Sequence, residues 1–300
     1  MVLVLFVAAC RTPAEPLPPM SSVIAEARRL DLAGDQPGAI TIFRQALERD
    51  EASYQAHYGL ARALDLEGHY DEARQHLSRA IELSSDADRD QTLRMMGIAW
   101  TFAGRTDEAV GAFTAVFDRR IEAGNFPGAA EEANELGRVY LESGDLERAE
   151  EWYRTGYETA GRDATRSAAL IDLADLRWAH AQARIAARRG QAAEAHAHEA
   201  EVKRLVDHGG NDDQGVQYPY LLGYVAFYLE DYKAALEHLA RADDADPFIL
   251  LLMAQASEKL GDADNAFAYY RKVLTSNSHA INAAFARPVA RAKLALERKP

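Results

Sequence analysis

Small and large apolar residues recur along this chain at fixed distances from a series of short polar turns. The turns are centred on six glycines and one glutamate, and the first four lie 34, 36 and 40 residues apart: Gly34, Gly68, Gly104, Gly144, Gly190, Glu230 and Gly261. A small residue stands seven positions before each turn: Ala27, Ala61, Gly97, Gly137, Ala183, Gly223 and Ala254. An alanine stands five positions after each turn: Ala39, Ala73, Ala109, Ala149, Ala195, Ala235 and Ala266. Nine positions after the turn the residue is large and apolar, except in the fifth copy: Phe43, Leu77, Phe113, Tyr153, Glu199, Leu239 and Tyr270.

These spacings predict a helix on each side of every turn, because they place the small and large residues on one helical face. Small residues on the facing sides let two antiparallel helices approach closely. We expect the bulky residue to fill the groove between neighbouring pairs. A single pair cannot bury its apolar face, so the pairs must stack on one another.

The pattern resembles the tetratricopeptide repeat family, whose unit is a helix pair of 34 residues. Leu136-Gly137 with Tyr140, and Leu222-Gly223, match the Leu-Gly element of the first helix, and Asp246-Pro247 matches the closing proline. The resemblance covers residues 21–276 in seven copies and implies an all-α fold, a right-handed α-solenoid. We expect an irregular pair or a bend at the fifth copy, which follows an Ala/Arg-rich stretch. Residues 279–299 are predicted to form a C-terminal capping helix, interrupted at Pro288, with a solvated outer face.

The N-terminus shows a second, separate pattern. Val2 to Ala9 is wholly apolar, and Val7-Ala8-Ala9-Cys10 resembles the lipobox of bacterial lipoproteins, although no Lys or Arg precedes it. We therefore expect a signal peptide over 1–9, lipidation of Cys10 and a Pro-rich tether over 10–20. This resemblance implies a lipoprotein of the bacterial cell envelope, membrane-anchored and facing the periplasm or the exterior. The alternative is an apolar terminus with no such role.

Composition and motifs disfavour several classes of function. The formal net charge of −13 among 300 residues argues against nucleic-acid binding, and a single Cys excludes disulfides within the chain and Cys-based zinc sites. No Gly-rich phosphate loop or nucleophile elbow is present. HEAEV at His198 begins like a zinc-protease motif, but Val202 stands where the second His is needed. We expect no enzyme activity, no metal and no cofactor.

Arginines recur on the face that lines the concave groove in tetratricopeptide repeat proteins. Six positions before the turn stand Arg28, Arg62, Arg138 and Arg184, and four positions earlier stand Tyr58, Arg94, Asn134 and His180. By bidentate hydrogen bonding, such a stripe suits a partner's carboxylate or an acidic peptide. The alternative is that these arginines pair with the chain's own acids, namely Asp31, Asp65 and Glu142.

The sixth copy adds an aromatic stripe, formed by Tyr220, Tyr224, Phe227 and Tyr228. Their spacing places them on one helical face, where they either anchor a peptide in the groove or pack in the core.

These observations predict a non-enzymatic protein-interaction scaffold that binds an extended partner segment in its concave groove, while a lipid anchor holds it at the membrane. One alternative is a structural or oligomeric assembly factor of an outer-membrane, pilus or envelope-polymer system, with the groove filled by the chain's own C-terminal helix. Another is a metal-dependent module in the region from His196 to Asp213.

Overall fold

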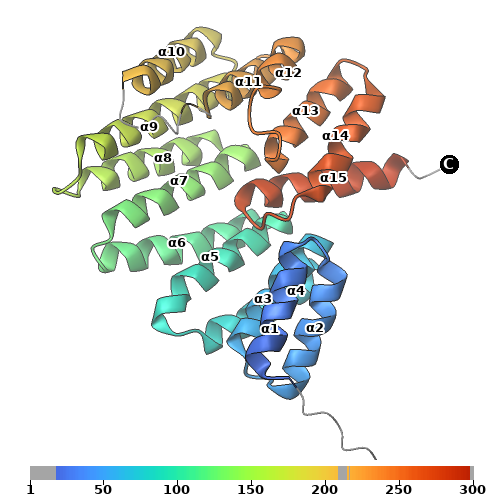
Figure 1. Ribbon diagram of the computed structural model, residues 1–300. Coiled ribbons are helices and arrows are strands. Elements are labelled where there is room, and N and C mark those ends of the chain that lie inside the picture. Colours follow the sequence, from blue (N-terminus) through green and yellow to red (C-terminus); the bar gives the residue numbers. More distant parts are fainter. Residues whose placement is uncertain (1–17, 209–214, 216, 298–300) are drawn as a thin grey trace, which may run out of the picture.

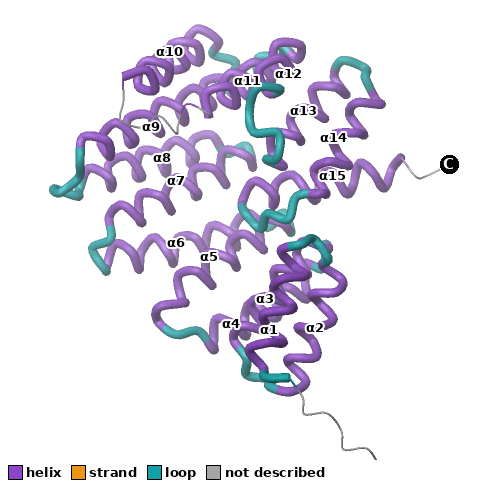
Figure 2. Tube along the Cα trace, viewed as in Figure 1, coloured by secondary structure: helices purple, strands orange, loops and turns teal. Residues whose placement is uncertain are grey.

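The computed structural model describes residues 18–208, 215 and 217–297. Within these ranges the chain forms 15 helices and no strand (Figure 2). The helices are α1 (Met20–Leu32), α2 (Gln36–Arg49), α3 (Tyr54–Glu67), α4 (Tyr70–Leu83), α5 (Asp86–Phe102), α6 (Thr106–Glu122), α7 (Phe126–Ser143), α8 (Leu146–Gly161), α9 (Ala168–Arg188), α10 (Ala192–His208), α11 (Tyr218–Tyr228), α12 (Tyr232–Leu239), α13 (Pro247–Lys259), α14 (Ala263–Thr275) and α15 (Ile281–Glu297). The predicted signal peptide, Cys10 and most of the Pro-rich tether lie outside the described residues.

Helices α1 to α14 form seven consecutive pairs that stack along a curved path (Figure 1). This all-α solenoid is the fold that the repeat pattern predicts. The path is irregular at the fifth pair, where α9 runs over 21 residues and the following helix α11 packs more against α9 than against α10. None of the helices in the described ranges is long and apolar enough to cross a membrane.

All seven turns that define the repeat have a left-handed backbone. The six glycines have φ between 67° and 94°, and Glu230 has φ 66°: Gly34, Gly68, Gly104, Gly144, Gly190 and Gly261. Left-handed geometry lets the chain reverse directly after the first helix of a pair, and glycine adopts it without a steric penalty from Cβ. Glu230 is the one residue at these turns that carries such a penalty.

We therefore expect Glu230→Gly to stabilise the protein. A non-glycine residue in the left-handed region destabilises the folded state by roughly 1–2 kcal/mol. Glycine removes this penalty, but its greater conformational freedom in the unfolded chain offsets part of the gain. Urea denaturation is expected to show a gain of about 1 kcal/mol for Glu230→Gly. The control variant Glu230→Ala keeps Cβ and is expected to show no gain, so equal effects of the two substitutions would contradict this explanation.

In the three copies whose small residue is glycine, the large residue packs against it within the same pair. A Cβ added to Gly97 would lie 2.8 Å from the Phe113 ring, and one added to Gly137 would lie 2.8 Å from the Tyr153 ring. The alanines five positions after the turns are at most 1% exposed. These two contacts lie within a pair, where the missing side chain of glycine makes room for a ring. The expected contact between neighbouring pairs also occurs, because a Cβ added to Gly59 on α3 would lie 2.2 Å from the Phe43 ring of the first pair.

The C-terminal helix differs most from the expectation. Helix α15 continues through Pro288, so the predicted interruption is wrong; the helix loses one backbone hydrogen bond there and is held by its packing. It also does more than cap the last pair, because it packs against α13, α14 and α5. Figure 1 shows it reaching from the last pair toward the first helices of the chain.

Buried polar contacts join α15 to the first repeats. The Arg287 guanidinium donates to the carbonyls of Ser276 (2.6 Å) and Leu274 (3.0 Å) near the end of α14, and to the Leu66 carbonyl (2.6 Å) near the end of α3. Arg291 donates to the same Leu66 carbonyl. Just before α15, His279 Nε2 lies 2.8 Å from the buried Asp65 carboxylate. The C-terminal segment therefore closes the solenoid by linking its last pair to its second.

Candidate functional site

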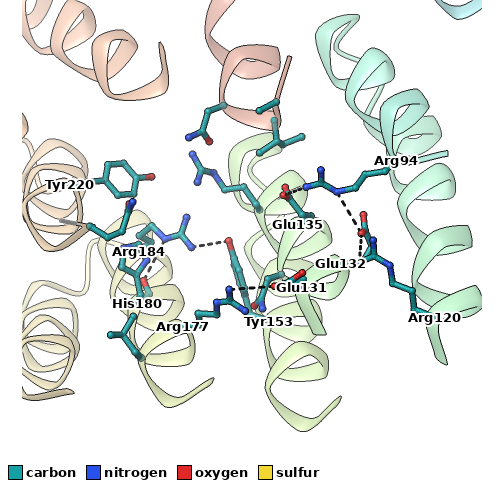
Figure 3. A pocket seen from close by; sticks show the side chains of 17 residues that line it. Arg94, Arg120, Glu131, Glu132, Glu135, Tyr153, Arg177, His180, Arg184 and Tyr220 are labelled. Atoms are coloured by element: carbon teal, nitrogen blue, oxygen red, sulfur yellow. Dashed lines mark hydrogen bonds and ion pairs between the residues drawn. The ribbon is translucent and has the colours of Figure 1, made fainter. Parts of the chain in front are cut away.

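A cavity of about 750 Å³ lies on the inner layer of the solenoid, within the described part of the chain. The first helices α5, α7, α9 and α11 and the start of α15 surround it, and Figure 3 shows their side chains converging. Half of the residues that the sequence analysis assigned to the groove line this one cavity: Arg94, Asn134, Arg138, His180, Arg184 and Tyr220.

On one side of the cavity the arginines are neutralised by glutamates of α7. The ion pairs join Arg94 to Glu135 (2.5 Å), Arg120 to Glu132 (3.1 Å) and Arg177 to Glu131 (3.8 Å). Glu132 is 1% exposed, and burial raises its pKa to about 7, against the opposing effect of Arg94 and Arg120. This side of the cavity therefore carries little excess charge.

The raised pKa of Glu132 predicts a specific pH dependence of stability. Between its ordinary value of 4.5 and about 7, the unfolded chain has lost this proton while the folded chain keeps it. The free energy of unfolding is therefore expected to fall, by an amount on the order of a few kcal/mol, as pH rises through this window.

Urea midpoints measured from pH 4.5 to 7.5 should fall less steeply for Glu132→Gln than for the unmodified chain. Glu131→Gln serves as the control, because Glu131 is exposed. Parallel pH profiles for all three proteins would show that burial of Glu132 does not control this dependence.

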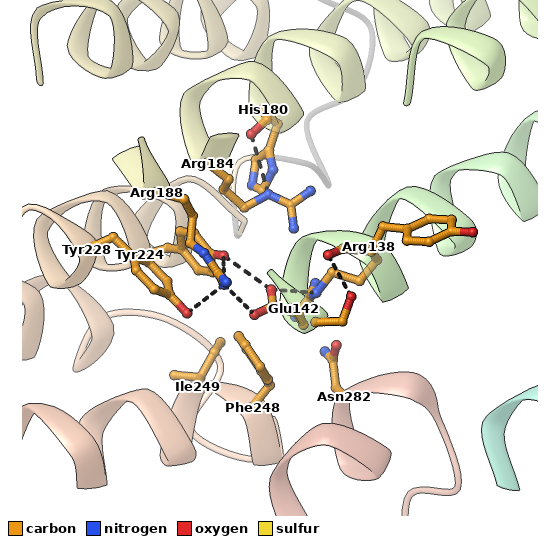
Figure 4. A network of polar contacts seen from close by, with 12 residues as sticks. Arg138, Glu142, His180, Arg184, Arg188, Tyr224, Tyr228, Phe248, Ile249 and Asn282 are labelled. Atoms are coloured by element: carbon orange, nitrogen blue, oxygen red, sulfur yellow. Dashed lines mark hydrogen bonds and ion pairs between the residues drawn. The ribbon is translucent and has the colours of Figure 1, made fainter. Parts of the chain in front are cut away.

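On the other side, two of three arginines are paired with one glutamate. Glu142 lies 3.1 Å from Arg138 Nε and 3.3 Å from Arg188 Nη1, and it accepts from the Tyr224 hydroxyl at 3.2 Å (Figure 4). Arg184 forms no ion pair with any described carboxylate. Its guanidinium donates instead to the Tyr153 hydroxyl (3.0 Å) and the His180 carbonyl (3.4 Å). Arg184 is only 5% exposed, so a buried cation faces the cavity without a carboxylate of its own.

Four buried polar atoms at this end of the cavity have no hydrogen-bond partner in the described structure: Arg138 Nη2, Arg184 Nη1, His180 Nε2 and the Tyr220 hydroxyl. Buried polar atoms are paired in the great majority of cases, so a cluster of four is unusual. Burial, followed by the charges of Arg184 and Arg138, lowers the pKa of His180 well below its ordinary value. Burial raises the pKa of Tyr220. At neutral pH the imidazole is therefore uncharged and the phenol keeps its proton.

The other residues predicted for the groove lie elsewhere. Arg28 is exposed on α1, and the Tyr58 hydroxyl accepts from Gln91 at 2.8 Å. Arg62 is paired with Asp31 and donates to the Asn277 carbonyl at 2.5 Å, so it serves the closure of the solenoid.

The sequence left open whether the aromatic residues of α11 pack in the core or face the groove, and the structure shows both environments. Tyr224 is completely buried and belongs to the core, whereas Phe227 and Tyr228 are half-buried. Tyr220 packs in the same core cluster at 6% exposed, yet its ring also forms part of the cavity wall.

The alternative of pairing within the chain is confirmed for two arginines, Arg62 with Asp31 and Arg138 with Glu142. Asp65 binds His279 instead. Sequence reasoning missed Arg177 and Arg188, although Arg177 stands two helical turns before Arg184 on α9. It also missed Arg120, at the end of a second helix where the repeat pattern gives no signal.

The region considered for a metal is only partly described. Within it, His196 Nδ1 lies 2.7 Å from Glu199 Oε2. This contact satisfies the carboxylate of Glu199, which stands at the repeat position where the other copies carry a large apolar residue. Across the residues that the structure describes, no three His, Cys, Asp or Glu side chains are grouped so as to hold a metal ion.

Two tetratricopeptide repeat models match the chain, one over residues 32–93 and the other over 101–169 and 220–281. The matched spans make up well over half of the chain, and the unmatched stretch between them contains most of the irregular fifth pair. No curated protein matches the chain.

Solved structures share the fold at low sequence identity. The apo form of RapI superposes with a TM-score of 0.58 at 13% identity, over 92% of this chain and 99% of that one. A Rap protein complexed with competence and sporulation factor gives 0.55 at 14% identity, over 93% and 76% of the two chains. A tetratricopeptide repeat protein from Parabacteroides merdae gives 0.53 at 13% identity, over 90% and 98%. At these identities the likeness concerns the fold alone.

Proposed function

The chain belongs to the tetratricopeptide repeat family, and on that basis we propose that it is a non-enzymatic interaction scaffold that holds a segment of a partner protein in its cavity. Proteins of this fold commonly serve as protein-interaction scaffolds. A Rap protein of similar fold has been solved in complex with competence and sporulation factor, which supports a binding role for this architecture.

The cavity between α5 and α11 is the observation that carries this proposal. It joins a large volume to a set of buried polar atoms that the chain itself leaves unpaired. A buried polar atom without a hydrogen-bond partner destabilises the protein, and a ligand or water that pairs with it removes this cost. A partner segment with matching polar groups therefore binds more tightly in this cavity. Because the whole chain carries a net charge of −13, the arginines of the cavity also make this a local site of attraction for an acidic segment.

The C-terminal helix limits the length of the segment. Helix α15 packs on α5 and contacts the end of α3, so part of the inner face is already filled by the chain itself. The partner segment is therefore short, and it lies along α5, α7, α9 and α11 rather than through the whole solenoid. The alternative of a self-filled groove thus applies to the N-terminal part only.

The scaffold is further proposed to be a lipoprotein of the bacterial cell envelope, anchored through Cys10. The support for this is the lipobox-like Val7-Ala8-Ala9-Cys10 after an apolar stretch. Mass spectrometry of the protein from native membranes should find an acylated Cys10 at the N-terminus, and an intact Met1 terminus would contradict the anchor.

Reversing one charge at the mouth of the cavity tests the binding role. Arg177 is 39% exposed and its ion pair with Glu131 is long, so Arg177→Glu should leave the fold intact. In pull-downs from envelope extracts we expect this variant to retain less than a tenth of the partner. Arg154→Glu on α8 is the matched control, because Arg154 is a similarly exposed arginine in one ion pair away from the cavity. Equal capture by both variants would contradict binding in the cavity.

A further inference from the structure

Two histidines of the second pair face each other between its helices. His57 Nδ1 on α3 lies 2.9 Å from His76 Nδ1 on α4, and the ring centroids are 5.1 Å apart. His57 is 8% exposed and the His76 side chain 22%, so little water reaches the contact. At this distance the two nitrogens form a hydrogen bond only if one ring donates and the other accepts.

A neighbouring contact decides which ring donates. His57 Nε2 lies 3.0 Å from the Glu51 carbonyl in the link between α2 and α3. A carbonyl can only accept, so this nitrogen carries a proton, and in a neutral imidazole the other nitrogen then carries none. The proton of the shared hydrogen bond therefore belongs to His76 Nδ1. In the neutral pair His57 has its proton on Nε2 and His76 has its proton on Nδ1.

The pair can take up one further proton and keep this hydrogen bond. The free position is Nε2 of His76, which lies 3.9 Å from Glu72 Oε1. A second added proton has only His57 Nδ1 left, where it would point at the proton on His76 Nδ1 across 2.9 Å. Two charged rings also repel each other strongly in a site that little water reaches. The contact is therefore incompatible with full protonation of both rings.

The surrounding charges act mainly against a charged His76. They are Glu72 on its own helix, His57 on α3 and Arg44 on α2, and Glu72 is already bound to Arg44 at 2.6 Å. Burial, followed by the charge of His57, lowers the pKa of His76 below its ordinary value of 6.5; Arg44 adds to this effect and Glu72 opposes it. The folded chain thus holds this proton less tightly than the unfolded chain, so its stability falls as pH falls below 6.5.

We propose that the His57–His76 contact is an acid-sensitive joint, which holds α4 against α3 while the rings share one proton at Nδ1 and lets the two helices separate locally when both rings are charged. The joint lies outside the cavity between α5 and α11, so it does not depend on the proposed function. The C-terminal segment is bound to α3 through Asp65 and the Leu66 carbonyl. Opening of the joint therefore also loosens the closure of the solenoid.

NMR of the ring nitrogens tests the protonation states in the unmodified chain, labelled with ¹⁵N at histidine. Near pH 7.5 we expect His57 with its proton on Nε2 and His76 with its proton on Nδ1. On acidification the two rings should titrate in separate steps, at least about one pH unit apart, with His76 first. The opposite tautomers, or independent protonation of both rings in one step, would overturn the joint.

Hydrogen exchange tests the opening locally, because burial of Glu132 gives the overall stability the opposite pH dependence. Protection of amides in α3 and α4 is expected to fall about tenfold or more between pH 7.5 and pH 5, after correction for the exchange rate of unprotected amides. Protection in α13 and α14, which contain no histidine, should change less than about threefold. Equal changes in the two pairs, or no change in either, would contradict the proposal.

Substitutions assign the effect to the two rings. The double variant His57→Gln/His76→Gln has neither titrating group, and protection of α3 and α4 should then change less than about threefold over the same pH range. His69→Gln is the matched control, because it removes an exposed histidine of the same pair and should keep the tenfold change. A tenfold change retained by the double variant would show that the joint is not the cause. The NMR titration decides the question even if the double variant fails to fold.

Discussion

Truncation after Ser278 is expected to cost the protein much of its stability and to open the solenoid. The deletion removes His279 and the whole of α15, whose Ile281, Ala283 and Ala284 pack with Leu66 and Phe102. It also leaves the Leu66, Leu274 and Ser276 carbonyls without the donors of Arg287. Lost apolar burial and unpaired carbonyls together should lower the free energy of unfolding by on the order of 5 kcal/mol or more.

Two measurements check this expectation. Urea unfolding should show a lower midpoint, and small-angle X-ray scattering should show a larger radius of gyration, because the last pair is no longer tied to α3 and α5. Arg287→Leu provides a milder version of the same change and should cost about 2 kcal/mol, since it leaves the Leu274 and Ser276 carbonyls without this donor while Arg291 still donates to the Leu66 carbonyl.

Arg271→Leu is the matched control for Arg287→Leu. Arg271 also contacts a residue of α15, namely Glu297, but its side chain is 58% exposed, so its loss should cost less than about 1 kcal/mol. If truncation left both the midpoint and the radius of gyration unchanged, α15 would be an appendage and would not close the solenoid.

Gly137→Ala is expected to destabilise the fourth pair, while the identical substitution at Gly111 is expected to stabilise the protein. A Cβ at Gly137 would lie 2.8–2.9 Å from three atoms of the Tyr153 ring, and this ring is 3% exposed and cannot move freely. Overpacking of this kind costs about 2 kcal/mol. Gly111 is exposed on α6 with nothing within 4 Å of its added Cβ, so alanine there should gain about 0.5–1 kcal/mol in helix stability.

Displacement of Tyr153 should also affect binding. Because the Tyr153 hydroxyl accepts from Arg184, Gly137→Ala is expected to weaken partner capture, whereas Gly111→Ala is not. Thermal unfolding and pull-downs on the two variants provide the comparison. Equal effects on stability would show that the close contact between helices is not what requires glycine at position 137.

Much of the fold follows from local sequence. The seven turns, including the one at Glu230, take the left-handed geometry that their position in the repeat requires. The aligned alanines are buried because one helical face of each pair is in contact with its partner. These features depend on residues within about 20 positions of each other, which is why a single sequence predicts them.

The course of α15 could not be predicted in the same way. Arg287 contacts the Leu66 carbonyl across 221 positions of sequence, and its acceptor is a backbone group that any residue would supply. The surplus of Arg and Lys in this helix reads as a solvated face, and nothing in the local pattern distinguishes Arg287, which is 5% exposed, from an exposed arginine.

The candidate site was predicted in part. Arg138 and Arg184 follow from the repeat register, which assigns them to the inner helices. The register does not predict which of these arginines forms an ion pair. Arg62 and Arg138 are paired with carboxylates of the chain, whereas Arg184 has none among the described residues. That distinction depends on which acid of another pair reaches which arginine, and the irregular fifth pair alters this geometry.

Photo-crosslinking in the native host tests most directly whether a partner enters the cavity. A benzoylphenylalanine would replace Glu131, an exposed residue of the cavity wall on α7, and in a second strain Glu151, an exposed residue of α8 in the same pair. We predict a crosslinked protein from position 131 and none from position 151, with the crosslinked peptide lying next to an acidic residue or a chain terminus. A partner crosslinked from position 151 and absent from position 131 would contradict binding in the cavity.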